Sequence, residues 1–163
     1  MTLFRVGLGH DIHAFADAES ERRLVLGGVE IMGARGLKGH SDADVLLHSI
    51  CDAVLGALGL GDLGRHFPDS DPHLAGVSSL LLLEKVVALM KERGYRLINL
   101  DAVVIAQEPR IAPHTAEMTR KIAAAMDATE EEVNLKGTSP EGLGSLGRKE
   151  GIAAETIVML GRV

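Results

Sequence analysis

The most constraining feature of this chain is an apolar pattern that switches several times between every second residue and every third or fourth residue. The first spacing is typical of strands and the second of helices, so the two kinds of element alternate along the chain. Extended segments are predicted around Phe4, Val6 and Leu8 and at residues 23–31, 96–107, 132–138 and 151–160. Helices are predicted at residues 41–58, 80–94 and 113–126. The pattern predicts one α+β domain over residues 1–163, a two-layer sandwich of ferredoxin-like or chorismate-mutase-like type in which a mixed sheet carries helices on one face.

Several residues predict where these elements begin and bend. Ser41 or Asp42 is expected to cap the first long helix, with Asp44 in its first turn. The second extended segment is predicted to be a single piece that bends at Gly27 and Gly28. One side of the strand at 96–107 is expected to face the core, through Ile98, Leu100, Ala102, Val104 and Ala106.

The composition limits the classes of partner. The chain has 163 residues, no Trp, one Tyr and three Phe, so it lacks the aromatic platform on which nucleic-acid bases usually stack. Its formal charge of −6 and the absence of a basic block also argue against a polyanionic partner. The longest apolar runs are far shorter than a membrane span, and no signal segment is recognised at the N-terminus. With Cys51 as the single cysteine, we expect a cytoplasmic protein that binds neither nucleic acid nor membrane.

Two short polar clusters interrupt the apolar pattern. In "GHDIHAF", Asp11 and His13 are two residues apart, so both side chains point the same way if the chain is extended. In "HSDADVLLHSICD", His48 lies on a predicted helix among apolar neighbours, with Asp44 and Asp52 one turn to either side. A buried imidazole without a partner costs about 1–3 kcal/mol, so His48 is expected either to be hydrogen-bonded or to bind a metal.

If His48 meets Asp11 and His13, the three side chains offer one oxygen and two nitrogens to a cation. Three protein ligands leave one tetrahedral position open, which is typical of catalytic zinc, whereas structural zinc is closed by four ligands that are often thiolates. The single cysteine excludes a closed thiolate site. The alternative for "GHDIH" is a hydrogen bond between histidine and aspartate that holds a loop in place.

Five motifs, in order and with their spacing, resemble one known family. They are "GHDIHAF", "HSDADVLLH", "LGDLGRHFPDSD", "AQEPRIAPH" and "GTSPEGLG" followed by "GRKEG", and they span nearly the whole chain. The family is that of the 2-C-methyl-D-erythritol 2,4-cyclodiphosphate synthases of the non-mevalonate isoprenoid pathway. The resemblance implies a homotrimer with active sites between subunits, which converts a CDP-linked methylerythritol 2-phosphate into a cyclic diphosphate and CMP. It also implies that Asp11, His13 and His48 bind Zn²⁺ or another divalent metal.

The resemblance assigns further roles in phosphoryl transfer. Glu141 matches the acidic residue that holds a second metal, Mg²⁺ or Mn²⁺, which bridges the diphosphate. His40 and Ser139 match groups that stabilise the transition state, and Arg148 and Glu155 match a charged pair near the threefold axis. Each assignment has a simpler alternative: a solvated loop carboxylate for Glu141, an ordinary turn residue for Ser139 and a surface ion pair for the last two.

The resemblance also implies a set of substrate contacts, in which the segment 106–112 forms the cytosine pocket. The full set is His40, Ser41, Asp62, Leu63, Gly64, Phe67, Pro68, Asp69, Ser70, Asp71, Ala106, Gln107, Glu108, Pro109, Arg110, Ile111, Ala112, Thr138, Ser139, Pro140, Glu141 and Arg148. Helix capping by Ser41, a helix stop at Asp62 and a plain turn at Asp69 and Asp71 are the alternatives. Arg110 stands where the family usually has lysine, and Pro140 and Ser145 also depart from the pattern, so binding of isoprenoid diphosphates in a central trimer cavity is not predicted.

Two other functions remain open on the residues alone. A zinc phosphohydrolase would use the open metal position to activate water. A metal-stabilised binding module would use the same ligands without catalysis, and would unfold when the metal is removed.

Overall fold

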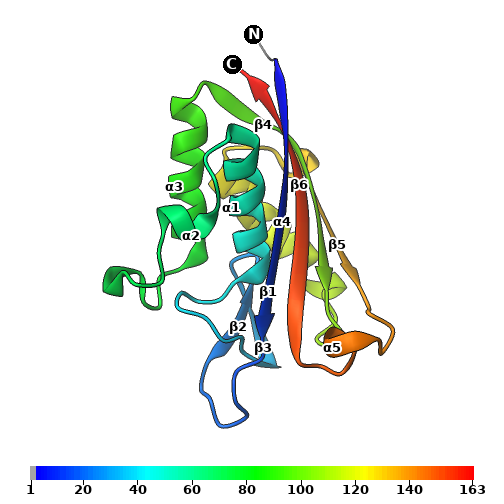
Figure 1. Ribbon diagram of the computed structural model, residues 1–163. Coiled ribbons are helices and arrows are strands. Elements are labelled where there is room, and N and C mark those ends of the chain that lie inside the picture. Colours follow the sequence, from blue (N-terminus) through cyan, green and yellow to red (C-terminus); the bar gives the residue numbers. More distant parts are fainter. Residues whose placement is uncertain (1–2) are drawn as a thin grey trace.

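A four-stranded mixed sheet forms one layer of the molecule (Figure 1). The computed structural model describes residues 3–163, so the first two residues of the predicted 1–163 domain lie outside the described residues. The strand order is β1-β6-β4-β5, with antiparallel pairing of β1 with β6 and of β6 with β4, and parallel pairing of β4 with β5. The strands are β1 (Phe4–Ala14), β4 (Tyr95–Ile105), β5 (Val133–Thr138) and β6 (Gly151–Arg162). The predicted mixed sheet is confirmed.

Three long helices cover one face of this sheet (Figure 1). They are α1 (Val45–Leu58), α3 (Ser79–Glu92) and α4 (Thr115–Met126). The shorter elements are α2 (Leu63–His66), α5 (Gly144–Gly147) and the 3₁₀ turns η1 (Pro72–Leu74), η2 (Ala112–His114) and η3 (Glu130–Glu132). Within residues 3–163, none of the helices has both the length and the hydropathy needed to cross a membrane. The two-layer α+β arrangement follows the prediction, and the core lies between the helices and the sheet.

Helix α1 lies directly against the backbone of β1 because two glycines leave room for it. A Cβ atom built on Gly7 would lie 1.8 Å from the carbonyl oxygen of Ala53, and one built on Gly9 would lie 1.8 Å from that of Ser49. Real Cβ contacts are never so short, so only glycine allows this approach. The residues that follow on the same side of β1 are Asp11 and His13, which therefore face the helix that carries His48.

The opposite side of the sheet, away from the helices, carries exposed apolar side chains. Val6 and Leu8 are 67% and 68% exposed, and Phe4, Ile12 and Ile157 are about half exposed. We call these five residues the open face. Contiguous exposed apolar surface on a folded domain usually marks a contact with another molecule.

The segment predicted as one bent extended piece is instead a hairpin, so that prediction was wrong. Strands β2 (Arg23–Leu26) and β3 (Val29–Arg35) pair antiparallel in a sheet of their own. Gly27 and Gly28 have φ angles of 58° and 73°. Two successive residues with positive φ form the tight turn that matches the twist of paired strands, so they reverse the chain and do not merely bend it.

The first helix begins later than predicted, at Val45 and not at Ser41 or Asp42. Asp44 is its N-cap, and its carboxylate accepts a hydrogen bond from Leu47 N at 3.0 Å. Ala43 has a φ of 58°, a left-handed conformation that cannot belong to an α-helix, so the helix cannot start before it. The same carboxylate accepts from the backbone N–H groups of Gly27 and Gly28, which ties the hairpin turn to the helix. Burial raises the pKa of Asp44 to about 6.

The core-facing side of β4 also differs from the prediction at one residue. Leu100, Ala102 and Val104 are buried as expected, but Ile98 is only partly buried and Leu97 takes its place. Leu97 pairs with Leu160 of β6, and Asn99 pairs with the adjacent Met159. Ile98 is therefore an extra residue in β4, and the register shifts there. Such a bulge turns the side chains before it onto the other face.

Candidate functional site

Asp11, His13 and His48 come together where β1 meets α1. His13 Nε2 and His48 Nδ1 each lie 3.0 Å from Asp11 Oδ2, and the two nitrogens are 3.2 Å apart. Within residues 3–163, these are the side chains that could hold a metal ion as a group of three or more. The predicted convergence of one carboxylate and two imidazoles is therefore present in the structure.

The spacing of the three atoms fits a small divalent cation. Zinc binds histidine nitrogen and carboxylate oxygen at about 2.0–2.2 Å, which places tetrahedral ligands about 3.3 Å apart. The observed separations of 3.0, 3.0 and 3.2 Å are slightly shorter. One oxygen and two nitrogens are also the donor types that a borderline-soft cation accepts, so residues and geometry both fit zinc or a similar ion.

Each imidazole is held by its other nitrogen. His13 Nδ1 donates to the backbone carbonyl of Lys38 at 2.6 Å, which leaves the Nε2 lone pair directed at the centre. His48 Nε2 lies 2.9 Å from Ser79 Oγ and 3.1 Å from Ser41 Oγ, and its Nδ1 faces the other two ligands. Both rings thus present a nitrogen to the same point.

The charges of the site favour a cation. Burial raises the pKa of Asp11, but hydrogen bonds from His13 and His48 outweigh it and hold the pKa well below its usual range. Burial lowers the pKa of His13, but its hydrogen bond and charge interaction with Asp11 outweigh that effect, and the pKa is raised above 6.5. The carboxylate is therefore ionised, and the centre attracts positive charge.

A cavity of about 460 Å³ opens beside the three ligands; we call it the metal cavity. It brings together seven of the predicted substrate contacts, which are His40, Ser41, Asp62, Leu63, Gly64, Phe67 and Asp69. Asp71 lies nearby in a different role, because its carbonyl accepts from His40 Nε2 at 3.0 Å and its carboxylate caps η1. Pro68 and Ser70 belong to the same 67–71 segment but do not line the cavity.

Asp52 also lines the metal cavity, although in the sequence it was noted only as an acidic residue one helical turn from His48. Its Oδ1 accepts from Leu63 N at 2.6 Å, which fixes the start of α2. Asp62 then caps α2 by accepting from Arg65 N at 2.9 Å. Burial raises the pKa of Asp52. Its position one helical turn after His48 was the available signal.

Eight further predicted contacts line a second cavity, of about 410 Å³, which we call the loop cavity, whereas Glu108, Pro140, Glu141 and Arg148 do not line it. Its predicted members are Ala106, Gln107, Pro109, Arg110, Ile111, Ala112, Thr138 and Ser139. Gln107 Oε1 accepts from Gly142 N at 2.9 Å, and Ser139 Oγ accepts from Glu141 N at 3.0 Å, so the two segments around the cavity are joined. Pro140 and Glu141 lie in the turn that follows.

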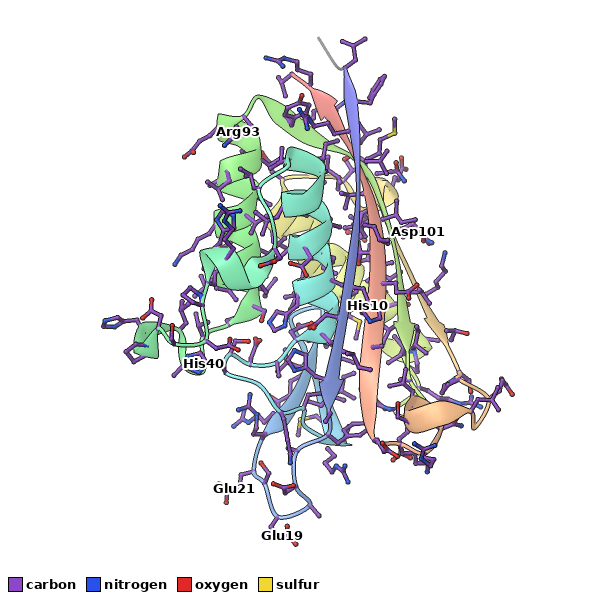
Figure 2. All side chains as sticks on the ribbon, viewed as in Figure 1. His10, Glu19, Glu21, His40, Arg93 and Asp101 are labelled. Atoms are coloured by element: carbon purple, nitrogen blue, oxygen red, sulfur yellow. The ribbon has the colours of Figure 1, made fainter. Side chains whose placement is uncertain are left out.

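The charged residues near the loop cavity pair among themselves. Glu108 forms an ion pair with Lys149 at 2.8 Å, and Arg148 with Glu150 at 2.7 Å. Glu155 lies 3.4 Å from His10, so the predicted Arg148–Glu155 pair does not form within this chain. In Figure 1, α2 beside the metal cavity and α5 beside the loop cavity lie on opposite sides of β1. Figure 2 shows His40, which lines the metal cavity, on the same side of β1 as α2.

These features define an α+β protein in which three side chains able to hold a metal ion face a polar cavity. The chain belongs to the YgbB family, whose model matches residues 4–161. It is 53% identical over 156 residues to a 2-C-methyl-D-erythritol 2,4-cyclodiphosphate synthase of Syntrophobacter fumaroxidans, covering 96% of both chains. It is also 53% identical over 162 residues to the enzyme of the same name from Thiobacillus denitrificans, covering 99% of both. The resemblance seen in the motifs is confirmed.

Solved structures agree with this assignment. A Plasmodium falciparum IspF in complex with CDP superposes with a TM-score of 0.86 at 33% identity, covering 99% of this chain and 98% of that chain. The bifunctional IspDF of Campylobacter jejuni gives a TM-score of 0.93 at 42% identity. The match covers 98% of this chain but 42% of the longer bifunctional chain.

Proposed function

We propose that this chain converts 4-diphosphocytidyl-2-C-methyl-D-erythritol 2-phosphate into 2-C-methyl-D-erythritol 2,4-cyclodiphosphate and CMP, as a phosphorus–oxygen lyase of the non-mevalonate isoprenoid pathway. An oxygen of the 2-phosphate forms a bond to the β-phosphorus, and the bond from that phosphorus to the oxygen bridging to the cytidine phosphate breaks. The observation that carries the proposal is the three-ligand centre beside a polar cavity, in a chain 53% identical to synthases of that name.

Phosphoryl transfer depends mainly on alignment and on neutralising charge, and the site residues supply both. Asp11, His13 and His48 would hold zinc or another divalent metal, and Glu141 would hold Mg²⁺ or Mn²⁺. When bound, these ions supply Lewis-acid polarisation of phosphate oxygens. The cavity residues keep the substrate next to the centre.

Ser41 has a free donor for a phosphate oxygen. Its Oγ accepts from Ala43 N at 3.2 Å and lies 3.1 Å from His48 Nε2, and neither contact requires the hydroxyl hydrogen of Ser41. The hydroxyl hydrogen is left to point into the metal cavity, which Ser41 lines. Capping and phosphate binding are therefore compatible at this residue.

His40 is restricted by its own hydrogen bond. Because Nε2 donates to the Asp71 carbonyl, the ring can donate to a phosphate oxygen through Nδ1 only as an imidazolium. The alternative is that substrate binding releases the bond to Asp71 and frees Nε2. Either route gives the transition-state stabilisation proposed for His40, with Ser139 as the second group.

The active protein would be a homotrimer with its sites between subunits. Two observations support this proposal: the predicted contacts divide between two separate cavities, and the open face carries exposed apolar side chains. A neighbouring copy packed on that face would cover apolar surface and could bring one copy's loop cavity to another's metal cavity. The cytoplasmic location and the absence of nucleic-acid and membrane partners stay predictions.

The direct test is product formation. The purified protein is expected to form cyclic diphosphate and CMP from the CDP-linked substrate, and a chelator should abolish turnover while the fold persists. Repeating the reaction in ¹⁸O water separates cyclisation, which incorporates no solvent oxygen, from hydrolysis, which incorporates one atom. Unfolding on metal removal, without any turnover of the loaded protein, would instead indicate a metal-stabilised binding module.

A further inference from the structure

We propose that Asp42 and Ser79 are positioning residues that fix the tautomer of His48 and thereby strengthen its hold on the metal. The inference rests on the proposed metal centre and adds two residues to it. Neither residue was singled out as a site residue in the sequence, and neither lines the metal cavity.

The hydrogen bonds around Ser79 fix the direction of each proton. Ser79 is fully buried, and its Oγ lies 2.5 Å from Asp42 Oδ1 and 2.9 Å from His48 Nε2. Asp42 also accepts from the Ser79 backbone N–H, through Oδ2 at 2.9 Å. An ionised carboxylate only accepts, so the single hydroxyl hydrogen of Ser79 points to Asp42.

The direction of that hydrogen decides the state of the imidazole. Because Ser79 presents lone pairs to His48, a proton must lie on His48 Nε2, so in the neutral imidazole that binds a metal Nδ1 keeps its lone pair. Nδ1 is the nitrogen that faces Asp11 and His13. Carboxylate-linked partners of this kind hold metal-binding histidines in one orientation and raise their basicity.

Ser41 does not do the same. Its Oγ is 3.1 Å from His48 Nε2, but it accepts from Ala43 N and donates to no carboxylate within the described residues. Its hydrogen can therefore turn toward the histidine or away from it, and Ser41 permits either tautomer. Only the Asp42–Ser79 pair selects one.

A purely structural role is the competing explanation. Asp42 precedes α1 and Ser79 begins α3, whose N-cap residue, Ser78, makes no side-chain capping bond. Asp42 thus also satisfies the first N–H of α3, and Asp42 N donates to the Val77 carbonyl at 3.0 Å. If Asp42 and Ser79 had only this structural role, removing the Ser79 hydroxyl would lower the free energy of unfolding and leave the affinity for the metal unchanged.

The test measures zinc affinity in Ser79→Ala by competition with a chromophoric chelator. Loss of an outer partner of this kind is expected to weaken zinc binding about 10- to 100-fold. A second readout is the exchange rate of the His48 Nε2 proton in the zinc-loaded protein, by ¹⁵N NMR, which should rise when its acceptor is removed. Ser78→Ala is the matched control, since its hydroxyl makes no capping bond, and both quantities should stay at wild-type values.

Asp42→Asn gives an independent check if Ser79→Ala folds poorly. Its amide offers one oxygen to the two Ser79 donors, so the hydroxyl hydrogen is free to turn toward His48 Nε2 and favour the other tautomer. Zinc binding should weaken as in Ser79→Ala. Unchanged zinc affinity in folded variants, with a wild type that binds zinc, overturns this inference alone. A wild type that binds no divalent metal overturns both the inference and the proposed centre.

Discussion

The two halves of the proposed active site are built in different ways. The metal half lies where β1 packs against α1. There Asp11, His13 and His48 are mostly buried and are hydrogen-bonded to one another and to the Lys38 carbonyl. The loop half, around Ser139 and Glu141, is exposed, and its described contacts stay within its own turn and the neighbouring 106–112 segment. One chain thus already gathers the three metal-binding side chains, while in the proposed trimer the packing of copies would join the two halves.

Removing a ligand from the metal half should have the largest effect. His48→Ala leaves an oxygen and one nitrogen, so zinc binding should be lost. Turnover should fall about 1,000-fold, because a catalytic metal contributes several kcal/mol to the transition state. Zinc content and the rate of CMP release are the measurements. His73→Ala, an exposed histidine in η1, is the control, and full turnover by His48→Ala would refute the metal half.

A substitution that disrupts the open face should separate the metal half of one copy from the loop half of its neighbour. A charge placed there by Leu8→Asp would be costly to bury between copies, so trimers should dissociate, and turnover should fall at least about tenfold while each chain still binds zinc. Light scattering, zinc content and turnover test this together. Met32→Asp is the control because Met32 is also an exposed apolar residue but lies on the β2–β3 hairpin. A fully active monomer would show that one chain contains the whole site.

A substitution in the loop half should change the dependence of turnover on the second metal and leave zinc binding unchanged. Glu141→Gln replaces a carboxylate by a weaker neutral oxygen ligand, so the Mg²⁺ concentration for half-maximal turnover should rise about tenfold with zinc content unchanged. Glu131→Gln, at an exposed glutamate within η3, serves as the control. An identical Mg²⁺ titration would exclude Glu141 as the ligand.

The pH dependence of zinc binding should be the most gradual effect, and the smallest over any one pH unit. The raised pKa of His13 means that protons compete for its Nε2 starting from above pH 6.5. Zinc affinity should therefore fall as the pH falls through that range, by up to about tenfold per unit for each proton displaced. Chelator competition between pH 8 and pH 5.5 measures this. An affinity that does not change over the range would argue that His13 is not a ligand.

The sequence was informative where chemistry and local spacing coincide. Asp11 and His13 at i and i+2 predicted a shared direction, and His48 on an apolar helix predicted a buried partner; the structure brings the three together. Contacts between distant segments carried no such signal. Asp42 and Ser79 are 37 residues apart, and nothing local in either motif indicates that they meet.

The errors in the fold prediction also have physical causes. A glycine pair can bend a strand or reverse it, and only the pairing of β2 with β3 decides between the two. The left-handed backbone of Ala43 and the bulge at Ile98 are likewise set by tertiary contacts and not by residue type. The helix start and one core position were therefore missed, as were the short helices α2 and α5, although the three long helices and the strands of the main sheet were predicted correctly.

The contact of α1 with Gly7 and Gly9 has a consequence for how the enzyme can change over time. At Gly7 and Gly9 the distance between β1 and α1 is set by main chain packed on main chain, and this distance positions Asp11 and His13 relative to His48. A single added methyl group at either glycine would push α1 away from β1 and separate His48 from Asp11 and His13. Substitution of either glycine is therefore expected to be excluded as the sequence evolves.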